Sequence, residues 1–152
     1  MKLRVLSIGK DRQKLHEPIV QEYAARIDRY QPFAMEVVGE SQGDDAAARL
    51  AEAALLRRRL RVRDVAVALD ERGETLTSPG LAARIQEMER SGGRDVAFLL
   101  GGASGLDPTL RAECGWALSL SRLTLPHQLA RLVLVEQLYR ALTILRGEPY
   151  HK

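Results

Sequence analysis

The residues best suited to chemistry lie in the last third of the chain. The tail reads Gly147-Glu-Pro-Tyr-His-Lys152, and a loop before a long apolar segment contains Pro126-His127. Tyr150, His151 and Lys152 offer an aromatic face, a titratable ring and a cation. A histidine can move a proton near neutral pH, and a cation can stabilise a developing anion. The alternative for the tail is a frayed chain end.

A second candidate is the glycine-rich segment Leu99-Leu-Gly-Gly-Ala-Ser-Gly-Leu106, where glycine allows the backbone to approach a ligand closely. The segment lacks the lysine of a P-loop and the glycine spacing of a dinucleotide fingerprint. Leu106 stands where a nucleophile elbow needs glycine, so Ser104 is expected in turn and helix-cap chemistry with Asp107-Pro108. The pattern predicts a ligand loop of unspecified kind, and a simple turn is the alternative.

Length and composition limit the class of protein. A chain of 152 residues with 45% apolar and 28% charged residues predicts one globular domain. The single cysteine excludes an internal disulfide, and three scattered histidines argue against a closed zinc site. No signal peptide and no apolar run of ~20 residues are evident. We therefore expect a soluble, cytoplasmic protein that uses neither a metal nor a membrane.

Strand and helix patterns alternate five times, which is typical of an α/β domain with a largely parallel sheet. The expected strands span residues 3–8, 33–38, 65–69, 96–100 and 116–121. Ligands in such sheets bind at the carboxyl ends of strands. Three such ends stand out, at Leu69-Asp70, Leu100-Gly105 and Leu120-Pro126.

Three helices are expected between these strands. The first, with Pro18 in its first turn, should bury Leu15, Ile19, Tyr23 and Ile27. The second, capped by Asp44 or Asp45, should bury Leu50, Leu55, Leu56 and Leu60. The third opens at Ser78-Pro79 and should bury Leu81, Ile85 and Met88.

The last predicted helix, residues 128–146, is apolar almost all the way round. One hypothesis is that the sheet covers one side and a second subunit the other; the alternative is a core helix in a monomer. Glu136 and Arg140 stand four residues apart on this helix, in the favourable order for an ion pair.

Positive charge is densest from Arg57 to Arg63, where five arginines occur. This cluster could hold a nucleic-acid backbone through phosphate contacts. Alternatively, the arginines simply complement the dipole at a helix C-terminus.

Four stretches together resemble one family. They are residues 99–106, Leu118-Ser-Leu-Ser-Arg-Leu-Thr-Leu-Pro-His-Gln128, Val135-Glu-Gln-Leu-Tyr-Arg-Ala141 and Arg146-Gly-Glu-Pro-Tyr-His-Lys152. The resemblance is to the SPOUT-class ribosomal RNA large subunit methyltransferase H family, which methylates N3 of a pseudouridine in 23S rRNA, and it covers the whole chain. It implies one SPOUT domain over residues 1–152 and a homodimer with the active site at its interface. It also implies a C-terminal trefoil knot, with the knot and cofactor site in about residues 99–152.

The same resemblance implies S-adenosylmethionine as cofactor and assigns roles to residues. The cofactor-binding positions would be Leu69, Gly101, Leu120, Ser121, Arg122, Leu123, Thr124 and Leu125. The catalytic candidates are His127, Glu136, Arg140, Tyr150, His151 and Lys152. Either a histidine accepts the N3 proton, or Arg140 or Lys152 stabilises the imide anion. The expected substrate is 23S rRNA within the 70S ribosome or large subunit.

Two rival hypotheses remain open at this point. A non-catalytic ribosome-assembly factor would have lost cofactor binding, which the intact Gly101 loop and tail disfavour. A SPOUT enzyme acting on tRNA is disfavoured by the short chain and by its Tyr150-His151-Lys152 ending.

Overall fold

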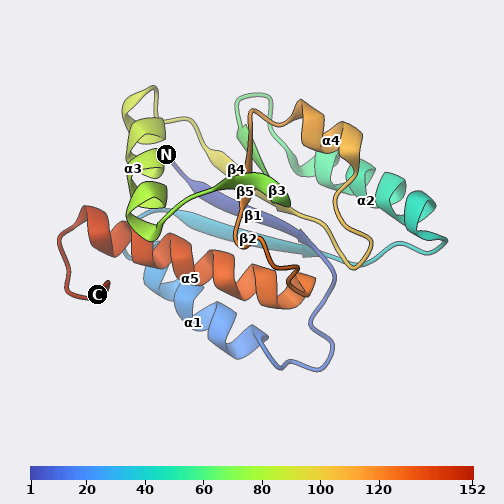
Figure 1. Cartoon of the computed structure of the whole chain (residues 1–152), viewed down its shortest axis with the longest axis horizontal. Coiled ribbons are helices and arrows are strands. Elements are labelled where there is room, and N and C mark those ends of the chain that lie inside the picture. Colours follow the sequence, from blue (N-terminus) through green and yellow to red (C-terminus); the bar gives the residue numbers. More distant parts are fainter.

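A computed structural model describes all 152 residues as a five-stranded sheet with helices on both faces (Figure 1). The strands are β1 (Leu3–Ile8), β2 (Phe33–Val38), β3 (Val65–Thr75), β4 (Val96–Leu100) and β5 (Trp116–Ser119). Their order is β2-β1-β4-β3-β5, and every neighbouring pair is parallel. The prediction of a single α/β domain with a parallel sheet is confirmed.

The helices are α1 (Glu17–Asp28), α2 (Asp45–Arg59), α3 (Ser78–Arg90), α4 (Pro108–Glu113) and α5 (His127–Leu145). Side-chain caps start three of them: Asp44 accepts from Ala47 N at 2.8 Å, Thr77 from Gly80 N at 3.0 Å, and Asp107 from Leu110 N at 3.0 Å. The N-cap of α3 is thus Thr77, and the helix begins at Ser78. None of the helices combines the length and apolarity needed to span a membrane.

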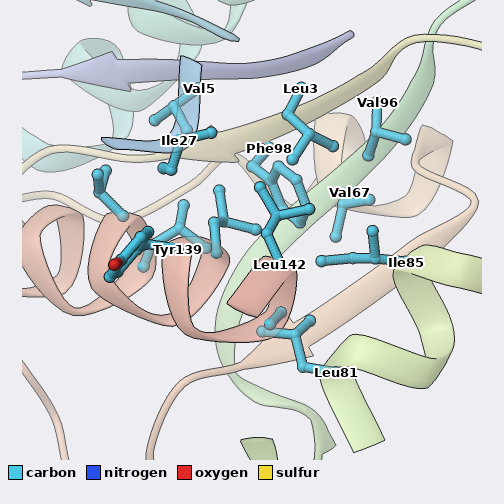
Figure 2. Packing of buried hydrophobic residues seen from close by; sticks show 14 of the residues in the cluster. Leu3, Val5, Ile27, Val67, Leu81, Ile85, Val96, Phe98, Tyr139 and Leu142 are labelled. Carbon is cyan, nitrogen blue, oxygen red and sulfur yellow. The ribbon is translucent and has the colours of Figure 1, made fainter. Parts of the chain in front are cut away.

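Alternate strand residues build two separate core layers. Leu3, Val5 and Phe98 face α1, α3 and α5, whose buried residues include Ile27, Ile85 and Leu142 (Figure 2). Leu6, Ile8 and Leu99 face α2 and α4 on the opposite side of the sheet. Because the central strands are covered on both faces, their sequences are apolar throughout.

Three leucine and isoleucine side chains expected in helix cores are exposed. Leu15 is 66%, Ile19 48% and Leu50 63% exposed. Leu15 precedes α1, whose buried side chains are Val20 and Ile27. The buried side of α2 consists of Ala48, Glu52, Ala53 and Leu56, because small alanines permit closer packing on the sheet. The buried sides of α1 and α2 therefore include fewer of the large apolar residues than the sequence predicts.

The strand β3 extends to Thr75, beyond the strand end expected at Leu69. It pairs with β5 at Leu69–Leu118 and again at Glu74–Leu118, so residues 70–73 form an irregular excursion between the two pairings. A Cβ atom at Gly73 would lie 2.6 Å from the carbonyl oxygen of Ala117. Glycine therefore allows this backbone to return to β5.

Most arginines of the Arg57–Arg63 cluster form ion pairs with carboxylates of the same chain. Arg57 binds Glu113 at 3.0 Å, Arg59 lies 3.4 Å from Glu36, and Arg61 lies 3.4 Å from Asp95. Only Arg58 and Arg63 of the five arginines form no ion pair. The structural interpretation of the cluster is therefore favoured over an RNA anchor.

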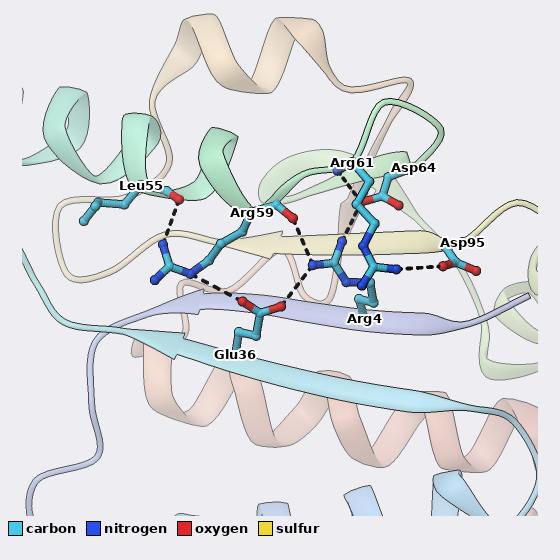
Figure 3. A network of polar contacts seen from close by, with 7 residues as sticks. All are labelled: Arg4, Glu36, Leu55, Arg59, Arg61, Asp64 and Asp95. Carbon is cyan, nitrogen blue, oxygen red and sulfur yellow. Dashed lines mark hydrogen bonds and ion pairs between the residues drawn. The ribbon is translucent and has the colours of Figure 1, made fainter.

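Buried Arg4 stands at the centre of the same region (Figure 3). The side chain, 4% exposed, binds Asp64 Oδ2 at 2.5 Å and Glu36 Oε1 at 3.0 Å, and donates to the Arg59 carbonyl oxygen at 2.9 Å. These contacts tie β1 to β2, to the end of α2 and to the start of β3.

Replacing Asp64 by alanine leaves the Arg4 charge buried with a single partly exposed carboxylate. We expect a loss of about 3 kcal/mol in the free energy of unfolding, measured by denaturant titration. Glu22→Ala breaks an exposed helix ion pair and serves as control; it should change stability little. Equal losses in the two variants would contradict a special role for the Arg4 network.

Candidate active site

A pocket of about 880 Å³ lies at the carboxyl ends of β3, β4 and β5. Three segments line it: Leu69–Arg72, Leu100–Leu106 and most of Leu120–His127. These are the three strand ends that the sequence predicts as ligand-binding positions. This volume falls within the range of pockets that bind small molecules and cofactors.

The pocket brings together all but one of the expected cofactor positions. The residues on its wall are Leu69, Gly101, Leu120, Ser121, Leu123, Thr124 and Leu125. Arg122 is exposed and does not line the pocket. Leu123 is 77% exposed, which leaves an apolar side chain at the rim.

Local hydrogen bonds shape the segment after β5. Ser119 Oγ donates to the Ser121 carbonyl oxygen at 2.9 Å, and Ser121 Oγ accepts from Leu123 N at 2.9 Å. Thr124 Oγ1 then donates to Glu71 Oε2 at 2.6 Å. The last bond joins this segment to the Asp70–Gly73 excursion, so both walls of the pocket are connected.

The glycine loop needs its glycines for its own closure. A Cβ atom at Gly101 would lie 2.6 Å from Leu106 N, and Gly105 has a φ of +82°. Gly105 N donates to the Gly102 carbonyl oxygen at 3.0 Å. Ser104 does not cap α4; its Oγ donates to Asp45 Oδ1 at 3.1 Å, which attaches the loop to α2.

The pocket wall also contains polar residues that were not among the predicted cofactor-binding positions. Asp70 pairs with Arg72 at 3.1 Å and with Arg111 at 2.9 Å. Burial raises the pKa of Asp70, but hydrogen bonds from Arg72 and the charge of Arg111 outweigh it, so the pKa is lowered and the carboxylate is ionised. Arg49 joins the wall from α2 and donates to the Ser104 carbonyl oxygen at 3.1 Å. The position of Asp70 at the end of a predicted strand indicated that it could line a ligand site. Nothing in the local sequence around Arg49 indicated this.

His127 is the catalytic candidate that lines the pocket. Its Nε2 atom lies 3.5 Å from Glu40 Oε1, and its ring fills the space beside Gly9. Burial lowers the pKa of His127, and the nearby Glu40 carboxylate offsets this only in part. The ring is therefore neutral at pH 7 and can accept a proton.

Four of the remaining catalytic candidates form a cluster on the C-terminal half of α5: Glu136, Arg140, Tyr150 and His151. The fifth, Lys152, is exposed and takes part in no hydrogen bond or ion pair. Glu136 Oε1 accepts from Arg140 Nη2 at 2.6 Å and from the Tyr150 hydroxyl at 2.9 Å. Arg140 Nη1 lies 3.2 Å from His151 Nδ1, and its guanidinium stacks over the Tyr150 ring at 4.7 Å. The predicted Glu136–Arg140 ion pair is confirmed, and the tail is bound to the helix.

Tyr150 also belongs to an aromatic group. Its ring lies 4.7 Å from that of Tyr139, and its hydroxyl lies 3.2 Å from that of Tyr23. Burial, followed by the hydrogen bonds with Tyr23 and Glu136, raises the pKa of Tyr150. The phenol therefore stays protonated at neutral pH.

One chain does not bring the tail cluster to the pocket. None of Glu136, Arg140, Tyr150, His151 and Lys152 lines it. His127 and Glu136 are nine residues apart on α5, which is about 13 Å along the helix. No group of three or more histidine, cysteine, aspartate or glutamate side chains that could hold a metal ion is found in the chain.

Comparison with known proteins identifies the family. A family model described as "Predicted SPOUT methyltransferase" matches residues 1–151. The chain belongs to this family. Members carry out methyl transfer, so the protein is a methyltransferase.

Curated relatives of this SPOUT methyltransferase match along its whole length. The protein named "Ribosomal RNA large subunit methyltransferase H" from Anaeromyxobacter sp. (strain K) is 51% identical over 155 aligned residues, covering 100% of both chains. The protein of that name from Geobacter sp. (strain M21) is 41% identical and covers 99% of each.

Solved structures show the same fold at low sequence identity. A "probable methylase family protein" from Haemophilus influenzae superposes with a TM-score of 0.56 at 15% identity, covering 99% of this chain and 70% of that one.

Gly101→Ala should prevent closure of the glycine loop, because the added Cβ meets the backbone of Leu106. We expect at least a tenfold loss of S-adenosylmethionine affinity by calorimetry. Gly115→Ala is the matched control, since a Cβ there meets no atom within 4 Å. Unchanged affinity in the Gly101 variant would place the cofactor away from this loop.

Proposed function

We propose that this SPOUT methyltransferase transfers a methyl group from S-adenosylmethionine to N3 of a pseudouridine in a stem-loop of 23S rRNA. The substrate is the assembled 70S ribosome or large subunit, so the enzyme works in the cytoplasm. The observation that carries the proposal is the pocket of about 880 Å³ at the strand ends, combined with a tail cluster of titratable and cationic groups. Full-length relatives named for ribosomal RNA methylation support this substrate.

The chemistry of the pocket wall fits the cofactor. Leu69, Leu120 and Leu125 provide an apolar slot for adenine, and adjacent main-chain groups can bind its edge. Gly101 lets the loop backbone lie close to the ligand. The cofactor supplies a methyl group already activated by a positive sulfur, so neither a metal nor a covalent intermediate is needed. We further propose that residues 99–152 form the trefoil knot of the family around this pocket.

A homodimer would bring the pocket, with His127 in its wall, next to the tail cluster. The tail cluster and the pocket lie toward opposite ends of α5, so two antiparallel copies of α5 would bring the tail of one subunit to the pocket of the other. Leu129 and Val133 near the pocket remain partly exposed on α5 although α1 and α3 flank this helix. The exposed Ile19 and Leu123 are further apolar surface for such an interface.

In such a site shared between two subunits, one group accepts the imide proton and another stabilises the resulting anion. His127 is neutral and lines the pocket, so it accepts the N3 proton directly or through water. The hydrogen bond to Glu136 raises the pKa of Arg140, which therefore supplies a permanent positive charge for the imide anion. Tyr150 provides a face on which the base stacks, and His151 and Lys152 add polar contacts to the RNA.

The proposal is tested by transfer of labelled methyl from S-adenosylmethionine to ribosomes that lack this modification, followed by nuclease digestion and mass identification of the nucleoside. Label in 3-methylpseudouridine is the expected result, with none in transfer RNA. Cofactor binding without label in ribosomes would contradict the proposed substrate. Failure to bind the cofactor at all would contradict the proposed reaction.

Removing Tyr150–Lys152 should reduce methylation at least 100-fold while S-adenosylmethionine affinity stays within twofold, because the tail residues do not line the pocket. Mixing this truncated chain with Gly101→Ala chains should restore activity, since the hybrid dimer holds one intact pocket and one intact tail on different subunits. Activity that stays absent in the mixture would contradict a site shared between subunits. Loss of the folded circular dichroism spectrum would make the tail structural instead.

A further inference from the structure

A second pocket, of about 390 Å³, lies beside the first at the carboxyl ends of β1 and β2. The loop that follows β1 and the start of α1 form much of its wall. Gln128 and Arg131 of α5 complete it, whereas the neighbouring His127 lines the cofactor pocket. The two pockets therefore adjoin at the first turn of α5.

The floor of this second pocket carries a buried cation without a counter-ion. Arg131 is 4% exposed; its Nε donates to Ser7 Oγ at 2.9 Å, and its Nη2 donates to the carbonyl oxygens of Ile8 and Gly9. The guanidinium forms no ion pair, and its Nη1 has no acceptor in the chain. Burial lowers the pKa of Arg131, and Asp11 and Glu17 act on it only at longer range. A buried, unpaired guanidinium is costly unless an anion approaches it.

Three more cations surround the opening. Lys10, Arg12 and Lys14 are exposed, line the pocket and take part in no ion pair. Asp11 and Glu17 also line it, so four cations stand against two carboxylates. Asp11 Oδ2 accepts from the His16 and Glu17 backbone N–H groups at 2.8 Å.

Hydrogen bonds fix the conformation of the basic loop, the segment after β1 that carries Lys10, Arg12 and Lys14. Gln128 Nε2 donates to the Lys10 carbonyl oxygen at 2.9 Å, and Lys14 N donates to the Asp11 carbonyl oxygen at 3.0 Å. Lys14 has a φ of +53°, a left-handed conformation that lysine rarely adopts. Such backbone conformations persist where the surroundings enforce them, and they are common at ligand-binding sites.

We propose that this second pocket binds a backbone phosphate of the RNA next to the target nucleotide. Phosphate oxygens match the fork of a guanidinium and the point charges of lysine. The inference rests on the proposed function and gives the RNA a contact adjoining the cofactor pocket. The Arg57–Arg63 cluster, by contrast, has most of its charges occupied within the chain.

The test removes the three exposed charges by Lys10→Gln, Arg12→Gln and Lys14→Gln in one variant. We expect KM for ribosomes to rise at least tenfold, with kcat and S-adenosylmethionine affinity within twofold of the parent. KM should also depend less steeply on salt concentration, because fewer phosphate contacts release fewer counter-ions. An unchanged KM would overturn the inference.

The matched control removes the same charge elsewhere by Arg58→Gln, Arg63→Gln and Arg90→Gln, all exposed and without ion pairs. Its KM should stay within twofold; an equal rise would show that only overall charge matters. Both variants must keep the molecular mass of the parent in solution, since a loss of assembly would assign the loop to subunit contact and overturn the proposal.

Ribosome binding by sedimentation without cofactor separates this inference from the proposed function. If the parent methylates no ribosomes, the proposed function fails. The pocket is still tested by ribosome affinity, which should fall at least tenfold in the loop variant alone.

Discussion

The pairing of β3 with β5 is the constraint on which the site depends. It brings the end of β3 and the segment after β5 to one edge, although about fifty residues separate them in sequence. The irregular stretch at Asp70–Gly73 frees polar side chains for the pocket wall without ending the strand. The Thr124–Glu71 hydrogen bond then joins the two walls.

The helix α5 connects the two pockets with the tail cluster. Its first turn divides two neighbouring pockets, and its C-terminal half carries the Glu136, Arg140 and Tyr150 cluster. The packing of α5 against α1 and α3 accounts for much of its all-round apolar sequence within one chain. Leu129 and Val133 stay partly exposed, and they are the part of α5 that a second subunit would cover in the proposed homodimer.

Much of the fold follows from local signals, since strands buried on both faces must be apolar throughout and the Asp44 and Asp107 caps act within one helical turn. The strand ends and the Glu136–Arg140 pair were predictable for similar reasons. The exposure of Leu15 and Leu50, and the ion pairs of Arg57 and Arg61, were not, because they depend on how distant elements pack. The burial of Arg131 against β1 likewise could not be predicted from the spacing of residues in the sequence.

The aromatic anchoring of the tail has a consequence for assembly. Tyr150 packs on Tyr139 and reaches Tyr23, and Tyr30 donates to Glu148 at 2.6 Å, so the tail is ordered before any second subunit arrives. Conformational entropy that a loose terminus would lose on association is already lost during folding. In the proposed homodimer, the folding of each chain would therefore preorganise the segment that its partner requires.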